Sequence, residues 1–306
     1  MCFPFLLFAL AASALVNGAS GQVLSIPARA DRVLLSATVV DEKGRPVRDL
    51  KASEVRIFEE GKPQVLAHFT KASDLHARVL LLVDASGSMN GELKTTSSRM
   101  AAFQVLAALG PEDETALAGF DSEYWGIVPF TSDRDRIKKG LEELVPFGST
   151  ALHDALDHAA HDIASHGEGR RAVVVITDGI DTSSQKKPDD VIARSRALDV
   201  PIYAISVISP LDDPASDQFV GKKTAGVAFQ GSAVLVRYAT LSGGAAFAVS
   251  DFHALRRAAD QIANELKTQY RLGYDPPVGP PRFRRVQVKT TRKGVVVRTR
   301  SGYVPS

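Results

Sequence analysis

Short apolar runs alternate with helical stretches between residues 78 and 268, and this alternation limits the fold more than any other feature of the chain. Strands that are apolar along their whole length are buried on both faces, and strands separated by helices form parallel sheets covered on both sides. The expected strands are residues 79–83, 115–120, 172–177, 201–208 and 245–249, with residues 126–130 as an edge partner. The sequence therefore predicts an α/β fold with a doubly wound, mostly parallel, Rossmann-like sheet.

The segments between these strands show the apolar spacing of amphipathic helices. Leu152, Leu156 and Ile163 recur at this spacing in one segment, and Leu255 and Ile262 do so in the last one. Residues 209–236 show no clear period, and we expect a long surface loop there.

Both ends of the chain have β-strand chemistry. Residues 33–69 hold short alternating strands with tight turns, and alternating strands return after residue 269. Two late strands cannot bury a face unaided. We therefore expect them to pair with the N-terminal unit, so that one small β domain surrounds an inserted α/β domain. The expected division is residues 30–72 for the N-terminal β unit, 76–268 for the α/β domain and 269–306 for the C-terminal strands.

The start of the chain has the pattern of a secretory signal peptide. Residues 1–21 combine an apolar core with small residues suited to cleavage near Gln22. We therefore expect a secreted, periplasmic or cell-envelope protein without a membrane span after cleavage. An uncleaved anchor is the alternative, because the basic start of a signal is missing. The only cysteine, Cys2, lies in this leader, which leaves the mature chain without thiol chemistry.

The charge balance limits the kinds of partner. The formal net charge of +2 supplies no strong field for nucleic acid or an anionic membrane. The basic run at residues 282–293 alternates along expected strands, so a solvated outer face is the favoured interpretation. We therefore expect no nucleic-acid partner, and partner choice must come from a local site.

Oxygen-bearing side chains lie at or beyond the ends of elements in the predicted sheet. Asp84, Ser86 and Ser88 follow the first strand, Thr150 precedes a helix, and Asp178 follows strand 172–177. Ligands bind outside the carboxyl ends of parallel strands, so we expect these side chains to converge. Carboxylate and hydroxyl oxygens are hard ligands, and they indicate Mg²⁺, with Mn²⁺ or Ca²⁺ as alternatives.

The motifs DASGSM, GST before a helix and TDG after a later strand resemble the metal-ion-dependent adhesion site of von Willebrand factor type A domains. The resemblance covers about residues 76–268, and the flanking segments look like those of exported bacterial relatives, especially a type abundant in acidobacteria. It implies that Ser86, Ser88 and Thr150 bind the metal directly. It also implies that Asp84 and Asp178 hold the metal through water or directly, and that a partner's Asp or Glu carboxylate completes the shell.

Other polar residues near these motifs have simpler interpretations. Asp121 is expected to form a turn, and Asp181 to fix its loop. His153, Asp157 and His161 fall on one helical stripe that suggests a zinc site, but a solvated helix face is the favoured interpretation.

These observations favour an exported, metal-dependent adhesion or scaffolding protein that captures an acidic side chain of a protein partner. The alternative is a metal-dependent hydrolase that uses the same cation to activate water. An enzyme needs a positioned base or nucleophile near the metal. The sequence has neither a Gly-x-Ser-x-Gly elbow nor a phosphate-binding glycine-rich loop, so we predict that the chain is not an enzyme.

Overall fold

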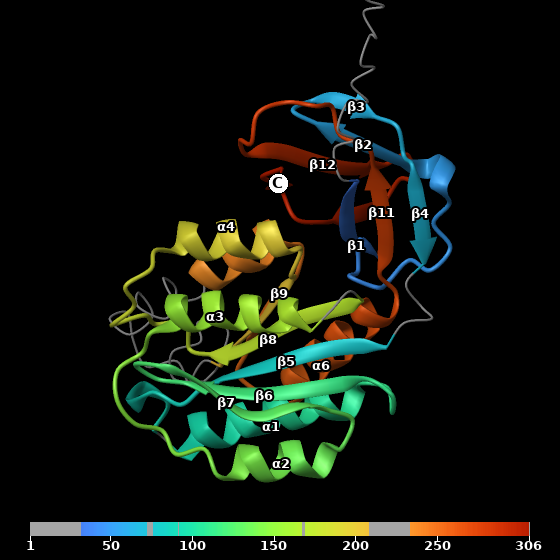
Figure 1. The fold of residues 1–306 in the computed structure, drawn as a ribbon. Coiled ribbons are helices and arrows are strands. Elements are labelled where there is room, and N and C mark those ends of the chain that lie inside the picture. The colour runs from blue at the N-terminus through green and yellow to red at the C-terminus, as the bar shows by residue number, and fades with distance from the viewer. Residues whose placement is uncertain (1–31, 72–75, 91, 167–168, 208–232, 306) are drawn as a thin grey trace, which may run out of the picture.

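The computed structural model describes residues 32–71, 76–90, 92–166, 169–207 and 233–305. They form an α/β domain on a six-stranded sheet and a smaller β domain made from both ends of the chain (Figure 1). The predicted fold class is therefore confirmed. The expected signal peptide lies outside the described residues. Within them, no helix is both long enough and apolar enough to cross a bilayer.

The six-stranded sheet has the strand order β10-β9-β8-β5-β6-β7. All neighbouring strands in it are parallel except β6 and β7, which are antiparallel. The neighbouring strands β5 and β8 are followed in sequence by β6 and β9, which lie on opposite sides of this pair, so the connections diverge between β5 and β8. Ligands of such sheets bind at this kind of switch point. The strands are β5 (Ala77–Asp84), β6 (Glu114–Phe120), β7 (Tyr124–Thr131), β8 (Arg170–Thr177), β9 (Ile202–Val207) and β10 (Ala246–Val249).

Helices cover both faces of this sheet, because its central strands are apolar on both faces. Along β5, Val79 and Leu81 pack into one core, and Leu80 and Leu82 pack into the other. The first core is closed by α1 (Glu92–Ala108), α2 (Arg134–Glu142) and α6 (Phe252–Lys267). The second is closed by α3 (Leu152–Ser165), α4 (Pro188–Leu198) and a helix over residues 233–242.

The helix at 233–242 corrects one expectation. Residues 209–236 were expected to form a loop, but residues 233–236 belong to this helix. Leu235 and Tyr238 are fully buried against the sheet, and this packing decides the helical conformation. Residues 208–232 lie outside the described part of the chain.

The β domain contains two four-stranded sheets, with the orders β13-β1-β11-β4 and β14-β12-β2-β3, and each combines N-terminal and C-terminal strands. Strand β1 pairs with β11 and β13, and strand β2 pairs with β12, all antiparallel. Residues from both sheets form one core, which includes Leu35, Ile57 and Leu272. The strands are β1 (Val33–Asp41), β2 (Val55–Glu59), β3 (Lys62–Gln64), β4 (His68–Lys71), β11 (Tyr270–Tyr274), β12 (Arg284–Thr290), β13 (Val295–Arg298) and β14 (Gly302–Tyr303).

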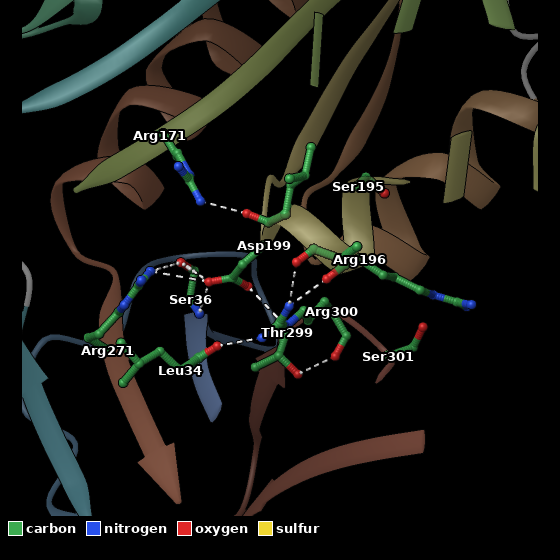
Figure 2. Close-up of polar contacts among 12 residues, drawn as sticks. Leu34, Ser36, Arg171, Ser195, Arg196, Asp199, Arg271, Thr299, Arg300 and Ser301 are labelled. Atoms are coloured by element: carbon green, nitrogen blue, oxygen red, sulfur yellow. Dashed lines mark hydrogen bonds and ion pairs between the residues drawn. The ribbon is translucent and has the colours of Figure 1, made fainter. Parts of the chain in front are cut away.

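The two domains meet at a polar cluster, called here the Asp199 cluster, which consists of the buried Asp199, Ser36 and Arg300 and the partly buried Arg271 (Figure 2). Asp199 ends α4 in the left-handed conformation, with φ of 51°. Its Oδ2 accepts hydrogen bonds from the Ser36 backbone N at 3.0 Å and from Arg271 Nη1 at 3.2 Å. The other oxygen lies 3.4 Å from Arg300 Nε. The cluster therefore joins the α/β domain to strands from both ends of the chain.

Candidate functional site

Asp84 is the last residue of β5 and is 3 % exposed. Its Oδ1 accepts a hydrogen bond from the Ser86 backbone N at 2.9 Å. Its Oδ2 accepts one from the Thr177 hydroxyl at 2.6 Å, and Thr177 is the last residue of β8. The carboxylate is therefore held across the ends of two neighbouring parallel strands.

The two predicted serine ligands lie side by side in the turn between β5 and α1. Ser86 is fully buried, Ser88 is exposed, and their hydroxyl oxygens are 3.1 Å apart. Gly87 between them donates its backbone N–H to the Gly148 carbonyl at 2.8 Å. A Cβ at Gly87 would lie 2.9 Å from that carbonyl oxygen, so a side chain there would displace one of the two loops. The close approach of the loops explains the glycine.

Thr150 lies in the loop before α3, and backbone hydrogen bonds join this loop to both neighbouring loops. Phe147 N donates to the Ala85 carbonyl at 2.7 Å, on the side of the serine turn. Thr182 N donates to the Thr150 carbonyl at 2.8 Å, on the side of the loop that follows β8. Thr150 itself is 2 % exposed. The three predicted ligand-bearing segments are therefore adjacent at the carboxyl edge of the sheet.

Asp178 follows β8 directly and is also buried, at 4 % exposure. Its Oδ1 accepts a hydrogen bond from Ile180 N at 3.2 Å. Its Oδ2 lies 2.9 Å from the ammonium nitrogen of Lys94, which is in the first turn of α1. Lys94 was missed in the sequence, although its place in the helix that follows the serine turn was a signal for it.

The pKa of Asp84 is raised from 3.8 to about 6, mainly because burial penalises its charged form. Hydrogen bonds from Ser86 and Thr177 oppose this shift, and the negative charge of Asp178 adds to it. The raised pKa indicates a carboxylate that is short of positive charge at neutral pH. Together with neighbouring hydroxyls, this donor chemistry fits a hard divalent cation such as Mg²⁺.

Asp121 and Asp181 behave as structural residues at the same edge. Asp121 Oδ1 accepts hydrogen bonds from Glu123 N and Ser122 Oγ at 3.0 and 3.1 Å, which is the turn predicted from the sequence. Asp181 Oδ1 accepts the Ser184 hydroxyl at 2.5 Å and fixes its own loop.

The histidine stripe on α3 is not the solvated face that was expected. His153 and Asp157 are 9 % and 7 % exposed, and only His161 faces solvent among the three. His153 Nδ1 lies 2.7 Å from the Tyr238 hydroxyl, and Asp157 pairs with Arg194 at 3.0 Å. The pairing side chains come from distant parts of the chain, so the helical spacing did not reveal them. Among the described residues, no group of three or more His, Cys, Asp or Glu side chains is arranged to hold a metal.

Two large apolar side chains lie exposed on the loop that carries Thr150. Val145 is 77 % exposed and Phe147 is 78 % exposed. The backbone of Phe147 is nevertheless held to Ala85 by its N–H, so the ring is presented from a fixed loop. The rim of the candidate site therefore has an apolar part, defined here as Val145 and Phe147.

Comparisons with known proteins agree with this architecture. The family model described as von Willebrand factor type A domain matches residues 79–180, from within β5 to just past Asp178. An uncharacterized protein of Borreliella burgdorferi is 27 % identical over 237 residues, which cover 70 % of this chain and 66 % of that protein. The chain thus spans slightly less than two thirds of the length of this curated relative.

Solved structures give a similar result. The von Willebrand factor type A protein from Catenulispora acidiphila aligns with a TM-score of 0.50 and 12 % identity, covering 90 % of this chain and 75 % of that one. The conserved hypothetical protein BatB from Bacteroides thetaiotaomicron aligns with a TM-score of 0.47 and 16 % identity, covering 63 % of this chain and 100 % of that one. The former likeness shows a shared fold. Residues 79–180 of the α/β domain therefore match the von Willebrand factor type A domain family, and the fold of the chain is that of such proteins.

Proposed function

We propose that this chain is a non-enzymatic binding protein that holds a divalent cation at the carboxyl edge of its sheet and captures an acidic side chain of a protein partner. Ser86, Ser88 and Thr150 would bind the cation directly, and Asp84 and Asp178 would hold it through water or directly. Mg²⁺ is the proposed cation, with Mn²⁺ and Ca²⁺ as alternatives.

The observation that carries this proposal is the buried Asp84 carboxylate, whose pKa is raised to about 6 beside the paired Ser86 and Ser88 hydroxyls. Hydroxyl ligands add no negative charge to a metal. A cation bound mainly by hydroxyls and water keeps more positive charge than one in a cage of carboxylates, and it therefore attracts an anionic ligand. An Asp or Glu carboxylate of a partner supplies that ligand.

The apolar rim supports a protein as the partner. Val145 and Phe147 project into solvent from a loop whose backbone is held in place. Interface cores are enriched in aromatic residues, and a rigid exposed aromatic ring is an effective anchor for a partner surface. A partner surface with a carboxylate next to an apolar residue could bind the cation and pack against the apolar rim at the same time.

A hydrolase is the alternative, and it would require a base positioned at the metal. His153 is only three positions after Thr150, but its Nδ1 lies 2.7 Å from the Tyr238 hydroxyl and its Nε2 is 3.7 Å from Asp181. Burial lowers the pKa of His153. These contacts give the imidazole a packing role between α3 and the helix at 233–242, and they favour the binding function.

The proposed location is the exterior of the cell or its envelope, in an exported bacterial protein. The leader pattern of residues 1–21 supports export. In this setting, adhesion or scaffolding would use divalent cations supplied by the surrounding medium.

The test combines metal binding with partner capture. Mn²⁺ is titrated into wild type, Asp84→Ala and the control Asp135→Ala, which removes an exposed carboxylate from α2. We expect Asp84→Ala to weaken Mn²⁺ binding at least about tenfold, because a buried carboxylate of the site is lost. The control should bind Mn²⁺ like wild type.

Each protein is then used to capture partners from an envelope extract of the parent organism, with Mg²⁺ or with EDTA. Capture that needs both Mg²⁺ and Asp84 supports the proposal. Identical capture with and without EDTA would contradict it. Turnover of a phosphoester or peptide that depends on Asp84 would instead establish the hydrolase.

A further inference from the structure

Lys94 occupies a charged position within the candidate site that the motif comparison does not explain. Its ammonium nitrogen lies 2.9 Å from Asp178 Oδ2, where the Asp178 side chain is 5 % exposed and that of Lys94 is 25 % exposed. The lysine therefore pairs with a buried carboxylate while part of its own side chain remains accessible to solvent.

The lysine partner of Asp178 contrasts with the partners of two other buried carboxylates among the described residues. The buried carboxylates of Glu59 and Asp199 are paired with guanidinium groups, from Arg284 in the first case and from Arg271 in the second. A guanidinium binds carboxylates through a planar fork, whereas an ammonium is a compact point charge on a flexible stem. A lysine is therefore the easier cation to move away from a carboxylate.

We propose that Lys94 is the resident counter-ion of Asp178 and that a divalent cation must displace it to bind, so that Lys94 sets the affinity of the site. This inference rests on the metal site of the proposed function. With the ammonium in place, Asp178 is already neutralised, and an incoming cation meets a like charge within a few ångströms. Binding therefore requires the Lys94 side chain to swing towards solvent, and the lost ion pair lowers the observed affinity.

The same exchange makes the site prefer divalent to monovalent cations. Na⁺ and K⁺ carry the same single charge as the ammonium, so they gain little Coulomb energy in its place, whereas a divalent cation gains about twice as much. Lys94 would thus keep monovalent ions out of the site and leave Asp178 neutralised in the apo protein.

The experiment measures Mn²⁺ affinity by calorimetric titration of the full chain at one pH and ionic strength. The variants are Lys94→Met and Lys94→Gln, which remove the charge, and Lys94→Arg, which retains it. The matched control is Lys138→Met, which removes an exposed lysine that pairs with Asp135 on α2. Far-ultraviolet circular dichroism verifies that each variant is folded.

We expect the two neutral variants to bind Mn²⁺ at least about tenfold more tightly than wild type, because the like charge is gone. Lys94→Arg should bind no more tightly than wild type, and Lys138→Met should match it. Mn²⁺ binding by the neutral variants alone, with none by wild type, would also support the inference.

The remaining outcomes separate the two proposals. If wild type binds Mn²⁺ and the neutral variants bind it equally or more weakly, the role of Lys94 is overturned and the metal site stands. If no folded protein of the set binds Mn²⁺, Mg²⁺ or Ca²⁺, both the metal site and the role of Lys94 are overturned.

Discussion

At the domain junction Asp199 lies against two arginines, whereas at the carboxyl edge of the sheet Asp84 accepts its hydrogen bonds from an amide and a hydroxyl. Both carboxylates are buried. The first is neutralised by groups that stay protonated at all ordinary pH values, because arginine does not lose its charge in proteins. The second receives dipoles without a full positive charge, and its pKa is raised to about 6.

The difference separates structural acids from acids available for a ligand. Glu59 in the β domain follows the pattern of Asp199. Its Oε1 accepts a hydrogen bond from Arg284 Nη1 at 3.0 Å, and its Oε2 accepts one from the Tyr274 hydroxyl at 2.6 Å. Such a carboxylate has its charge compensated by the fold itself. At the carboxyl edge, Lys94 pairs with Asp178, whereas Asp84 is held by Ser86 and Thr177, and the proposed divalent cation would supply the charge that Asp84 lacks.

The largest expected effect comes from breaking the junction with Asp199→Ala. Removing one partner of a buried ion pair leaves the other charge uncompensated, and this costs about 3–5 kcal/mol. Arg300 is 7 % exposed and would be left in that state. Urea unfolding followed by tryptophan fluorescence and circular dichroism should show the loss.

Asp199→Asn is the control for backbone strain at this position, because asparagine tolerates the left-handed φ of 51° better than alanine does. Asp199→Asn should therefore regain the part of the stability that Asp199→Ala loses through backbone strain, but not the part lost with the negative charge. A loss below about 1 kcal/mol for Asp199→Ala would show that the junction does not depend on this carboxylate.

The next effect has the opposite sign and concerns Asp84→Asn in EDTA. The folded-state pKa of Asp84 is raised from 3.8 to about 6, so the folded protein holds this proton more tightly than the unfolded chain. The tighter proton binding adds to the free energy of unfolding. This contribution is fully present below pH 3.8 and is lost as the pH rises through about 6. The neutral variant avoids this loss and should be more stable than wild type by up to about 3 kcal/mol above pH 6.

Unfolding measured in EDTA at pH 4 and pH 8 tests this prediction, since the difference between the two proteins should shrink at pH 4. Addition of Mn²⁺ at pH 8 should stabilise wild type and leave Asp84→Asn unchanged. A variant that is less stable than wild type at pH 8 in EDTA would mean that the carboxylate is as well compensated as Asp199.

The smallest effect on stability is expected for Phe147→Ser. The ring is 78 % exposed, so the free energy of unfolding should change by no more than about 0.5 kcal/mol. Mn²⁺ affinity should also stay unchanged, because Phe147 is not a proposed ligand. Partner capture should fall, because the rim loses its aromatic anchor.

Val278→Ser is the matched control, since Val278 is 76 % exposed and lies in the β domain between β11 and β12. Equal capture by Phe147→Ser and wild type would remove the apolar rim from the binding surface and leave the cation as its proposed centre.

Much of the fold was predictable because its signals are local. The apolar strands of the central sheet, the edge position of β7 and the pairing of the two chain ends all followed from the spacing of apolar residues and from turn chemistry. The helix at 233–242 was missed, since its helical state depends on burial of Leu235 and Tyr238 against the sheet. The predicted ligands remain a prediction, although their loops are joined by hydrogen bonds such as that from Thr182 N to the Thr150 carbonyl.

The sequence by itself determined where strands end and which oxygen-bearing side chains stand at those ends, because both are properties of neighbouring residues. Only the tertiary structure decided which charges meet. Lys94 and Asp178 are 84 positions apart, and Ser36 and Asp199 are 163 apart. Such pairs depend on how helices and strands pack, and packing is set by the burial of the whole core rather than by any short stretch of sequence.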